Sequence, residues 1–410
     1  MADFGYDIAD FRAIEPIFGT MEDFKILRDT FHEKVVPEVR PEHRPYSDYY
    51  VWVDAKYVNG TRTPPCNWLS YFEGSAWTWN ENRQKYYLHQ YHRKQPDLNY
   101  RNPAVMKEMQ EVLRFWLDLG SMASDTKPTT TKFMATEAYS TLDDTMRYYG
   151  NATNNGSHFP FNFLLTTEVD RQSEKMPAGK WADWVMIGNH DKPRAASRFG
   201  RDMLDSIHMI QFLIPGTVVT YMGDEIAMKD AFIRWKETVD PPGINSGKRL
   251  YTRFSRDPSD RRSCGTTPSA LGFRRTVRRG YRFTPTTGTS TSPSRRKSPK
   301  SHLSIYKRLL KLKSFPVIQR GSVKLTAPNE NILVIERRQE KTVFVAVINI
   351  GSFYETFDLT KHVSLPEPKL VVYTSSMNCE HKEDEGVDAS AIKLRPKAGV
   401  VLSNQKNKVD

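Results

Sequence analysis

Short apolar runs alternate with helix-forming segments in the middle of the chain, and this alternation limits the fold more than any other feature. The runs lie at 132–136, 161–165, 184–187 and 218–221, and the segment 203–214 between the last two has helical periodicity. Strands that alternate with helices form β–α units, which assemble into a parallel sheet or barrel. The sequence therefore predicts an α/β fold whose chemistry lies at the carboxyl ends of the strands.

Acidic residues follow three of these runs. Glu137 follows the first, Asn189-His190-Asp191 follows the third, and Asp224-Glu225 follows the fourth. Cleavage of a glycosidic bond needs one carboxyl group to protonate the leaving oxygen and another to attack the anomeric carbon or activate water. One glutamate at a strand end is more often an ordinary surface carboxylate, so the prediction of a sugar-cleaving site depends on the acids occurring together.

Length and composition are those of a protein with two or three folded domains. The chain has 410 residues, of which 38% are hydrophobic and 12% aromatic. Aromatic rings stack on sugar rings, although core packing is the more ordinary role of any one ring. No apolar run approaches the ~20 residues that span a bilayer, and Met1–Asp7 does not resemble a secretory signal. Three Asn-X-Ser/Thr sequons, which are common by chance, are compatible with secretion; they begin at Asn59, Asn151 and Asn155.

The cysteine pattern predicts neither a disulfide framework nor a zinc site. The three cysteines are Cys66, Cys264 and Cys379, and they are sparse and odd in number. None has the short Cys or His spacing typical of zinc ligands. We expect no cofactor and no metal held by cysteine, and a carboxylate-bound calcium ion stays an open alternative.

The positive charge is concentrated in one segment. The net charge is +12, and residues 259–300 hold nine Arg, two Lys and one Asp, which gives +10 and leaves +2 for the rest. Such a composition predicts disorder. A basic arm that binds nucleic acid is the competing interpretation, but a single basic segment on an otherwise balanced chain favours no nucleic-acid partner.

Turn signals and periodicity divide the chain into six parts. The most clearly bounded helix starts at the N-cap Asn102 and Pro103 and stops before Gly120. Its predicted core-facing side chains are Val105, Met106, Met109, Val112, Leu113 and Trp116. The predicted parts are a barrel fragment (1–44), an irregular excursion domain (45–100), a second part of the barrel (101–258), the basic segment (259–300), a last barrel helix (301–316) and an antiparallel all-β domain (317–410).

Five segments, in the correct order, resemble the signature segments of the α-amylase-type glycoside hydrolases. The residues around these segments are similar to those of the insect maltases. The resemblance covers 1–258 and 301–410. The segments are Asp3–Phe11, Gln95–Asn99, Phe133–Tyr139, Gly188–Asp191 and Thr220–Ile226.

The resemblance implies a (β/α)8 TIM-type barrel and the retaining hydrolysis of terminal α-linked glucose from a disaccharide or small oligosaccharide, in a secreted protein with no membrane span. It implies that Glu137 is the general acid/base and that Asp191 stabilises the transition state with His190 beside it. The remaining substrate-binding residues that it implies are Asp7, which would hold the terminal glucose, Tyr6, which would stack on it, and Arg194, a basic residue near the bottom of the pocket.

The chain departs from the family pattern where the catalytic nucleophile belongs. The family continues after this helix with a strand that carries the nucleophilic Asp, whereas here Gly120 runs into 121–127 without such a strand. Asp118 lies in the helix and Asp125 has no strand, so no nucleophile is found. The strand expected after the predicted helix at 24–33 and the first barrel strands are also missing. We expect an incomplete barrel with about four of eight strands and negligible hydrolysis.

Residues 259–300 have a different explanation. Reading Cys264–Gly272 as codons shifted by one base permits Trp-Asp-Asp-Thr-Glu-Arg-Thr-Gly, which is similar to the family at this point. We therefore expect a frameshift relative to the ancestral sequence, with the frame restored near Ser301. Two further functions stay open, namely an inactive relative like the glycosidase-like heavy chains of amino-acid transporters, and a non-catalytic sugar-binding protein.

Overall fold

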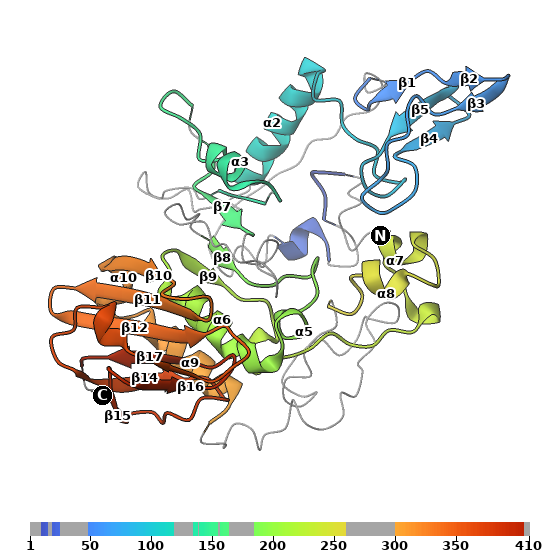
Figure 1. Ribbon diagram of the computed structural model, residues 1–410. Helices are drawn as coiled ribbons and strands as arrows, with labels where there is room; N and C mark the ends of the chain where they lie inside the picture. Colours follow the sequence, from blue (N-terminus) through green and yellow to red (C-terminus); the bar gives the residue numbers. More distant parts are fainter. Residues whose placement is uncertain are drawn as a thin grey trace. The chain divides into compact units, whose positions relative to one another are not determined.

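The computed structural model describes residues 10–14, 19–24, 48–118, 134–137, 139–154, 156–163, 184–259 and 300–405. The chain forms two compact units (Figure 1). The first combines residues 1–134 with 233–257, and the second combines residues 135–232 with 258–410. Apart from Ser259 and Lys300, the predicted basic segment lies outside the described residues.

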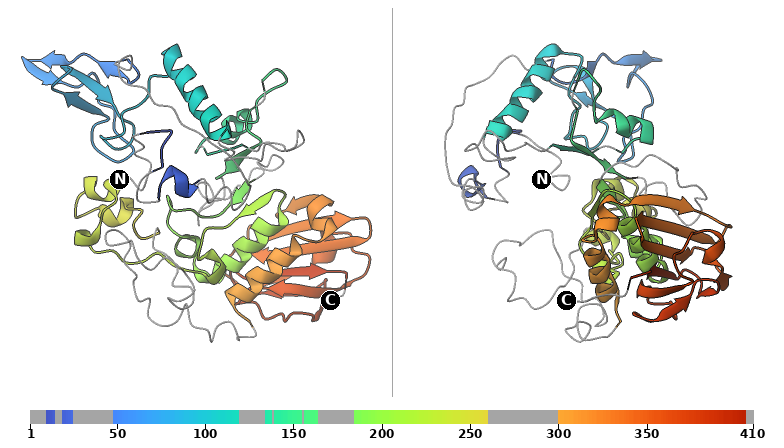
Figure 2. Two further views of the ribbon diagram at one scale, coloured as in Figure 1. Left: turned by 180° about the vertical axis from the view of Figure 1, so that it is seen from behind. Right: turned by 90° about the vertical axis from the view of Figure 1, so that its left-hand side faces the viewer.

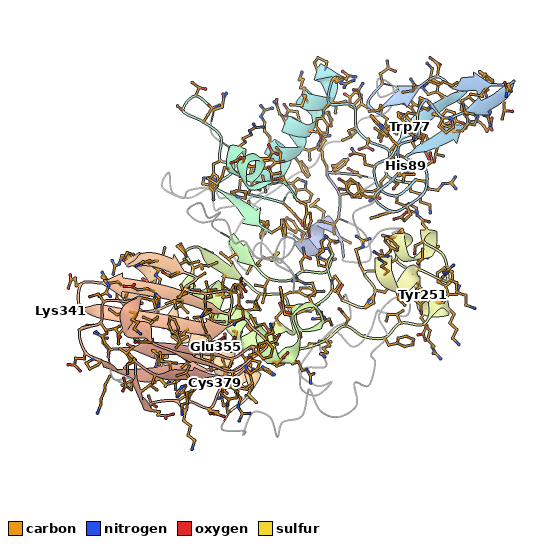
Figure 3. All side chains as sticks on the ribbon, in the orientation of Figure 1. Trp77, His89, Tyr251, Lys341, Glu355 and Cys379 are labelled. Atoms are coloured by element: carbon orange, nitrogen blue, oxygen red, sulfur yellow. The ribbon has the colours of Figure 1, made fainter. Side chains whose placement is uncertain are left out.

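The first unit contains a small antiparallel sheet with strand order β1-β5-β4, a separate β2–β3 hairpin and short helices. Its apolar core is formed by Ala76, Trp77 and Tyr86. Figure 3 labels Trp77 and, beside it, His89, whose ring nitrogens contact the Thr78 hydroxyl and the Tyr91 carbonyl. The elements are β1 (Trp52–Val53), β2 (Lys56–Val58), β3 (Thr61–Thr63), β4 (Trp77–Asn80), β5 (Lys85–Leu88), α2 (Pro103–Asp118), η3 (Trp235–Glu237), α7 (Pro241–Asn245) and α8 (Tyr251–Phe254).

Helix α2 begins where the sequence predicts, because Asn102 Oδ1 accepts a hydrogen bond from the Ala104 amide at 2.9 Å. The prediction for its apolar face is partly wrong. Val105 and Val112 are buried, whereas Met106 is 45% and Leu113 56% exposed. Each exposed residue follows a buried one and is turned ~100° from it around the helix axis, so the buried stripe is narrower than the apolar pattern.

The second unit contains the predicted parallel sheet, with strand order β6-β7-β8-β9. Three strands lie within the expected runs or overlap them closely. The second begins two residues earlier than predicted, because Phe161 pairs with Trp184 and this register sets where β7 lies. The strands are β6 (Ala135–Thr136), β7 (Phe159–Asn162), β8 (Trp184–Met186) and β9 (Thr217–Val219).

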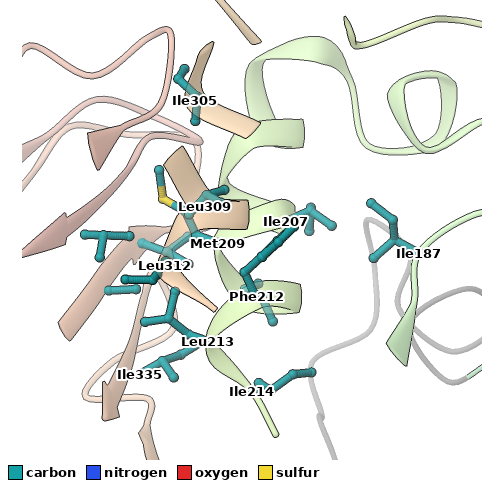
Figure 4. Close-up of a cluster of buried hydrophobic side chains, with 14 of the residues drawn as sticks. Ile187, Ile207, Met209, Phe212, Leu213, Ile214, Ile305, Leu309, Leu312 and Ile335 are labelled. Carbon is teal, nitrogen blue, oxygen red and sulfur yellow. The ribbon is translucent and has the colours of Figure 1, made fainter. Parts of the chain in front are cut away.

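Helix α6 (Arg201–Leu213) connects β8 to β9 and is buried along its length from Met203 onward. Figure 4 shows the reason: Phe212 points toward Ile187 at the end of β8, whereas Leu213 lies toward Ile335 of the carboxyl-terminal domain. Because it is covered on two sides, α6 carries buried apolar residues on both, together with four buried polar residues. Further helices of this unit are α3 (Leu142–Arg147), α5 (Ala195–Arg198), η2 (Asp224–Ile226), α9 (His302–Leu312), α10 (Pro316–Arg320) and η5 (Leu359–Lys361).

The carboxyl-terminal domain is an antiparallel sheet of order β10-β11-β12-β17-β14-β15 with a two-stranded β13-β16 sheet. Successive side chains of β12 enter different cores: Val345 packs in the core between the sheets, whereas Phe344 packs with α6 and α9. Figure 2 shows these helices along one face of the sheet. The strands are β10 (Ser322–Thr326), β11 (Ile332–Gln339), β12 (Thr342–Asn349), β13 (Glu355–Phe357), β14 (Lys369–Ser375), β15 (Gly386–Asp388), β16 (Ile392–Leu394) and β17 (Gly399–Ser403).

Candidate active site

Glu137 immediately follows β6 at the carboxyl end of the parallel sheet. The hydroxyl of Thr136, the last residue of β6, lies 3.0 Å from that of Ser157, whose hydroxyl also donates to the Tyr148 carbonyl at 3.0 Å. These contacts tie the end of β6 to the chain that enters β7. The glutamate is therefore carried by a strand end that is fixed on one side by its neighbour.

The segment after β8 carries Asn189, His190 and Asp191. The Asn189 side chain is buried, and its Oδ1 accepts a hydrogen bond from the Asp191 amide at 3.1 Å. Its Nδ2 donates to the hydroxyl of Tyr139, which in turn lies 3.5 Å from Asp191 Oδ2. Asn189 and Tyr139 thus join the segment after β6 to the segment after β8, and this brings the predicted acids to one edge of the sheet.

His190 and Asp191 lie side by side at this edge. His190 Nε2 is 3.6 Å from Asp191 Oδ1, and both side chains are partly exposed. The His190 carbonyl accepts a hydrogen bond from the Ser259 hydroxyl at 3.0 Å. The segment that presents the two side chains is thus held through its backbone, while their polar atoms stay accessible to a ligand.

The carboxyl group of Glu137 has a raised pKa. Partial burial among protein atoms is the largest cause, and repulsion from the Asp191 carboxylate adds to it, whereas His190 acts in the opposite direction. Two carboxyl groups with different environments divide into an acid and a base. The raised pKa keeps Glu137 protonated to higher pH than an ordinary glutamate, as a general acid requires.

Arg194 is fully buried, unlike Glu137, His190 and Asp191. Its backbone amide donates to Asp230 at 3.0 Å, and its guanidinium donates to the Met222 carbonyl at 2.7 Å and lies 4.9 Å from the centre of the Tyr221 ring. Tyr221 and Met222 belong to the turn after β9. Arg194 therefore connects the segments after β8 and β9 beneath the edge of the sheet.

Two residues of this region were not assigned a role from the sequence. Tyr139 closes the contact between the segments after β6 and β8, and its ring stacks on Phe163 after β7 with centroids 4.2 Å apart. Asp224 is 1% exposed, and its carboxylate lies against Gly188. Both residues lie within signature segments, which could have suggested them, but the burial of Asp224 depends on contacts that no local pattern reveals.

Several predicted features fall outside the described part of the chain. Tyr6 and Asp7 lie there, as does Asp125, whereas Asp118 is the last residue of α2 in the first unit. Within the described ranges, no group of three or more His, Cys, Asp or Glu side chains could hold a metal ion. In the same ranges, no helix combines the length and apolarity needed to cross a membrane.

The family described as "Alpha amylase, catalytic domain" matches residues 1–123 and 119–321, as two segments. Maltase A1 of Drosophila melanogaster is 32% identical over 502 aligned positions, which cover 98% of this chain and 87% of the maltase. Because 98% of 410 residues is about 402, about 100 of those positions hold no residue of this chain. Salivary alpha-glucosidase of Aedes aegypti is 30% identical over 98% of this chain and 86% of its own length.

Solved structures agree on the fold. Trehalulose synthase MutB from Pseudomonas mesoacidophila MX-45 superposes with a TM-score of 0.73 at 21% identity, covering 97% of this chain and 89% of the synthase. The fold is of the TIM-barrel type of this family with a carboxyl-terminal antiparallel sheet domain, and the described residues contain four parallel strands. The chain belongs to the α-amylase family of glycoside hydrolases, and its relatives include maltases and α-glucosidases.

Proposed function

We propose that Glu137, His190 and Asp191 form the acid–base part of an α-glucosidase site for terminal α-linked glucose in disaccharides and small oligosaccharides. The observation that carries this proposal is the pairing of the acids at one edge of the sheet, where the Asp191 charge helps to raise the Glu137 pKa. The general acid of a glycosidase must be protonated when the substrate binds, and a raised pKa favours that state.

In this proposal Glu137 is the acid that protonates the glycosidic oxygen. In a complete retaining enzyme the same group would later activate the water that releases glucose from a carboxylate nucleophile, which is the group that this chain lacks. Asp191 and His190 lie where they would contact the hydroxyl groups of the sugar. Tyr6 and Asp7 are proposed to hold the terminal glucose, by resemblance alone. Arg194 would act from beneath the edge of the sheet, because its guanidinium already donates to the Met222 carbonyl and lies over the Tyr221 ring.

We further propose that this polypeptide binds α-glucosides but hydrolyses them negligibly, because it lacks the strand that carries the nucleophile. The two segments of the family match meet at 119–123, next to the place where the sequence predicts that this strand is missing. The roughly 100 unfilled positions in the alignment with Maltase A1 also support an internally shortened chain. A glycosidase that has the general acid but lacks the nucleophile hydrolyses its substrate several powers of ten more slowly. We also propose that the protein is secreted, because one of its relatives is named a salivary alpha-glucosidase.

Calorimetry with maltose and a glucose-release assay test this function together. The expected result is measurable heat of maltose binding and no release of glucose above that of a Glu137→Gln variant. Glu367→Gln, which changes an exposed glutamate of the same unit, is the matched control. A pH-dependent maltase activity that Glu137→Gln abolishes would show that a nucleophile is present. A chain that folds but binds no maltose would remove the proposed sugar site.

A further inference from the structure

Asp224 is a buried carboxylate next to the candidate active site that the proposed reaction does not use. It begins η2, directly after Gly223, whose φ of +96° lies in the left-handed region. The Asp224 side chain is 1% exposed, and its backbone carbonyl lies 3.3 Å from His208 Nε2 of α6. The backbone of Asp224 is therefore fixed by the turn at Gly223, whose conformation favours glycine, and by the contact with the buried His208.

The carboxylate packs against the start of the segment that carries the site. A Cβ atom built on Gly188 would lie 3.2 Å from Asp224 Oδ2 and 3.8 Å from Oδ1. Gly188 precedes Asn189, so the Asp224 carboxylate lies against the backbone one residue before the link to Tyr139. The Asp224 carboxylate therefore occupies the space beside Gly188 that a larger side chain would need.

Two arginines of the same region complete the arrangement. Arg198 donates hydrogen bonds to the Ile187 carbonyl and, at 3.1 Å, to the Pro193 carbonyl, so it holds both ends of the segment 188–192. Arg194 and Arg198 both interact electrostatically with Asp224. The charge on Asp224 therefore acts on the arginine that clamps the site segment as well as on the backbone of Gly188.

Burial makes this charge change near neutral pH. Among the described residues, no group donates a hydrogen bond to either carboxylate oxygen, and desolvation raises the pKa of Asp224 to about 7 despite the two arginines. The titratable and charged groups that face Asp224 are Arg194 and Arg198 after β8, His208 of α6, Glu225 of η2 and Tyr306 of α9.

We propose that Asp224 is a positioning residue, whose buried carboxylate acts through Gly188 and Arg198 to set the segment that presents Asn189, His190 and Asp191. Ionisation of Asp224 adds a negative charge that attracts Arg198, the residue that holds both ends of the segment, so the environment of the segment depends on the charge of this carboxyl group. The inference rests on the proposed function only for the identity of the site. It concerns the protein without sugar, so the two proposals can fail separately.

The test follows the side-chain amide signal of Asn189 by NMR as the pH is changed, in the full chain without ligand. An asparagine amide does not titrate, so an inflection in its shift reports a neighbouring group. The measurements use a His190→Gln background, because an imidazole beside the reporter ordinarily titrates in this range. In that background we expect an inflection near pH 7, its loss on addition of Asp224→Asn, and its persistence on addition of Glu137→Gln or of the exposed control Asp202→Asn. Arg198→Met should reduce it, because the clamp on the segment is gone.

Two results would overturn the proposal. One is an inflection near pH 7 that survives in Asp224→Asn, which would assign it to another group. The other is an Asn189 signal that is constant through this range in the His190→Gln background alone, which would show that Asp224 does not act on the segment. If Asp224→Asn does not fold, Arg198→Met decides, because an unchanged inflection in that variant excludes the arginine as the link.

Discussion

The side-chain amide of Asn189 donates a hydrogen bond to the hydroxyl of Tyr139, fifty residues earlier in the chain. Tyr139 follows β6 and Asn189 follows β8, and the Tyr139 ring stacks on Phe163, which follows β7. One tyrosine therefore joins the ends of three parallel strands. Because Glu137 lies two residues before Tyr139 and Asp191 two residues after Asn189, the same contact sets the spacing of the two acids.

Replacing Asn189 by Ala should destabilise the second unit by about 1–3 kcal/mol, because the Tyr139 hydroxyl and the Asp191 amide lose the buried Asn189 side chain as a hydrogen-bond partner. Tyr139→Phe removes the same contact from the other side and should cost a similar or smaller amount. Urea denaturation measures both. Asn154→Ala changes an exposed asparagine of the same unit and is the control. Equal stability of all three variants and the wild type would show that the contact contributes nothing.

Asp191→Asn should lower the pKa of Glu137, because it removes a negative charge that disfavours ionisation of the glutamate. Burial is the larger cause and is unaffected, so the pKa should fall only part of the way toward the usual value. A pH titration of the Glu137 carboxyl carbon by NMR measures this. Asp143→Asn on the exposed side of α3 should leave the titration unchanged. A rise in the Glu137 pKa would contradict the electrostatic coupling of the two acids.

Local patterns predicted the elements that hold the site, because strand and helix periodicity depend on neighbouring residues. The parallel strands, helix α6, the N-cap Asn102 and the all-β domain all follow from such patterns. What the patterns could not predict is burial caused by distant segments. Helix α6 is covered on a second side because α9 and β11 pack there, more than 90 residues later in the sequence.

The sequence predicted the positions of Glu137 and Asp191, because both lie in signature segments at strand ends. It did not predict the burial of Arg194 and Asp224, because that depends on distant segments. Arg194 is fully buried because Met222 and Tyr221, 28 and 27 residues later, cover it. Asp224 could be placed after a strand, but its contact with Gly188 and its raised pKa arise only when the two strand ends meet.

Asp224→Asn should stabilise the protein at neutral pH and have no effect in acid. The folded pKa of about 7 is raised above the unfolded value of 3.8, so burial costs nothing below pH 3.8, where both states are protonated. The cost grows as the pH rises from 3.8, because the unfolded chain ionises first, and it is complete above pH 7. At about 1.4 kcal/mol per unit, the gain at pH 8 should be roughly 2–4 kcal/mol.

Denaturation at pH 4 and at pH 8 measures this difference, with Asp202→Asn as the exposed control on α6. The stabilisation by Asp224→Asn should be present at pH 8 and nearly absent at pH 4. A variant that is less stable than the wild type at pH 8 would mean that the attraction of Arg194 and Arg198 outweighs the cost of burying the charge. The direction of the pH dependence is thus the decisive observation.

Asp205 of α6 is predicted to hold three parts of the second unit together. It is 1% exposed, its Oδ1 lies 2.8 Å from His302 Nδ1 at the start of α9, and its Oδ2 accepts a hydrogen bond from the Met377 amide at 2.9 Å. Asp205→Ala should therefore destabilise the unit by about 2–4 kcal/mol, because the His302 ring and the Met377 amide, both in partly buried contacts, lose a buried and charged acceptor. Asp202→Ala, one turn earlier and exposed, should cost less than ~1 kcal/mol.

A double-mutant cycle with His302→Ala separates the two contacts of Asp205. If the contact with His302 contributes to stability, Asp205→Ala should lower the free energy of unfolding by about 1–3 kcal/mol less in the His302→Ala background than in the wild type. The remainder then belongs to the Met377 amide, which connects α6 to the chain after β14. Additive losses in urea denaturation would show that His302 and Asp205 do not stabilise each other, and the joint between α6 and α9 would then depend on apolar packing alone.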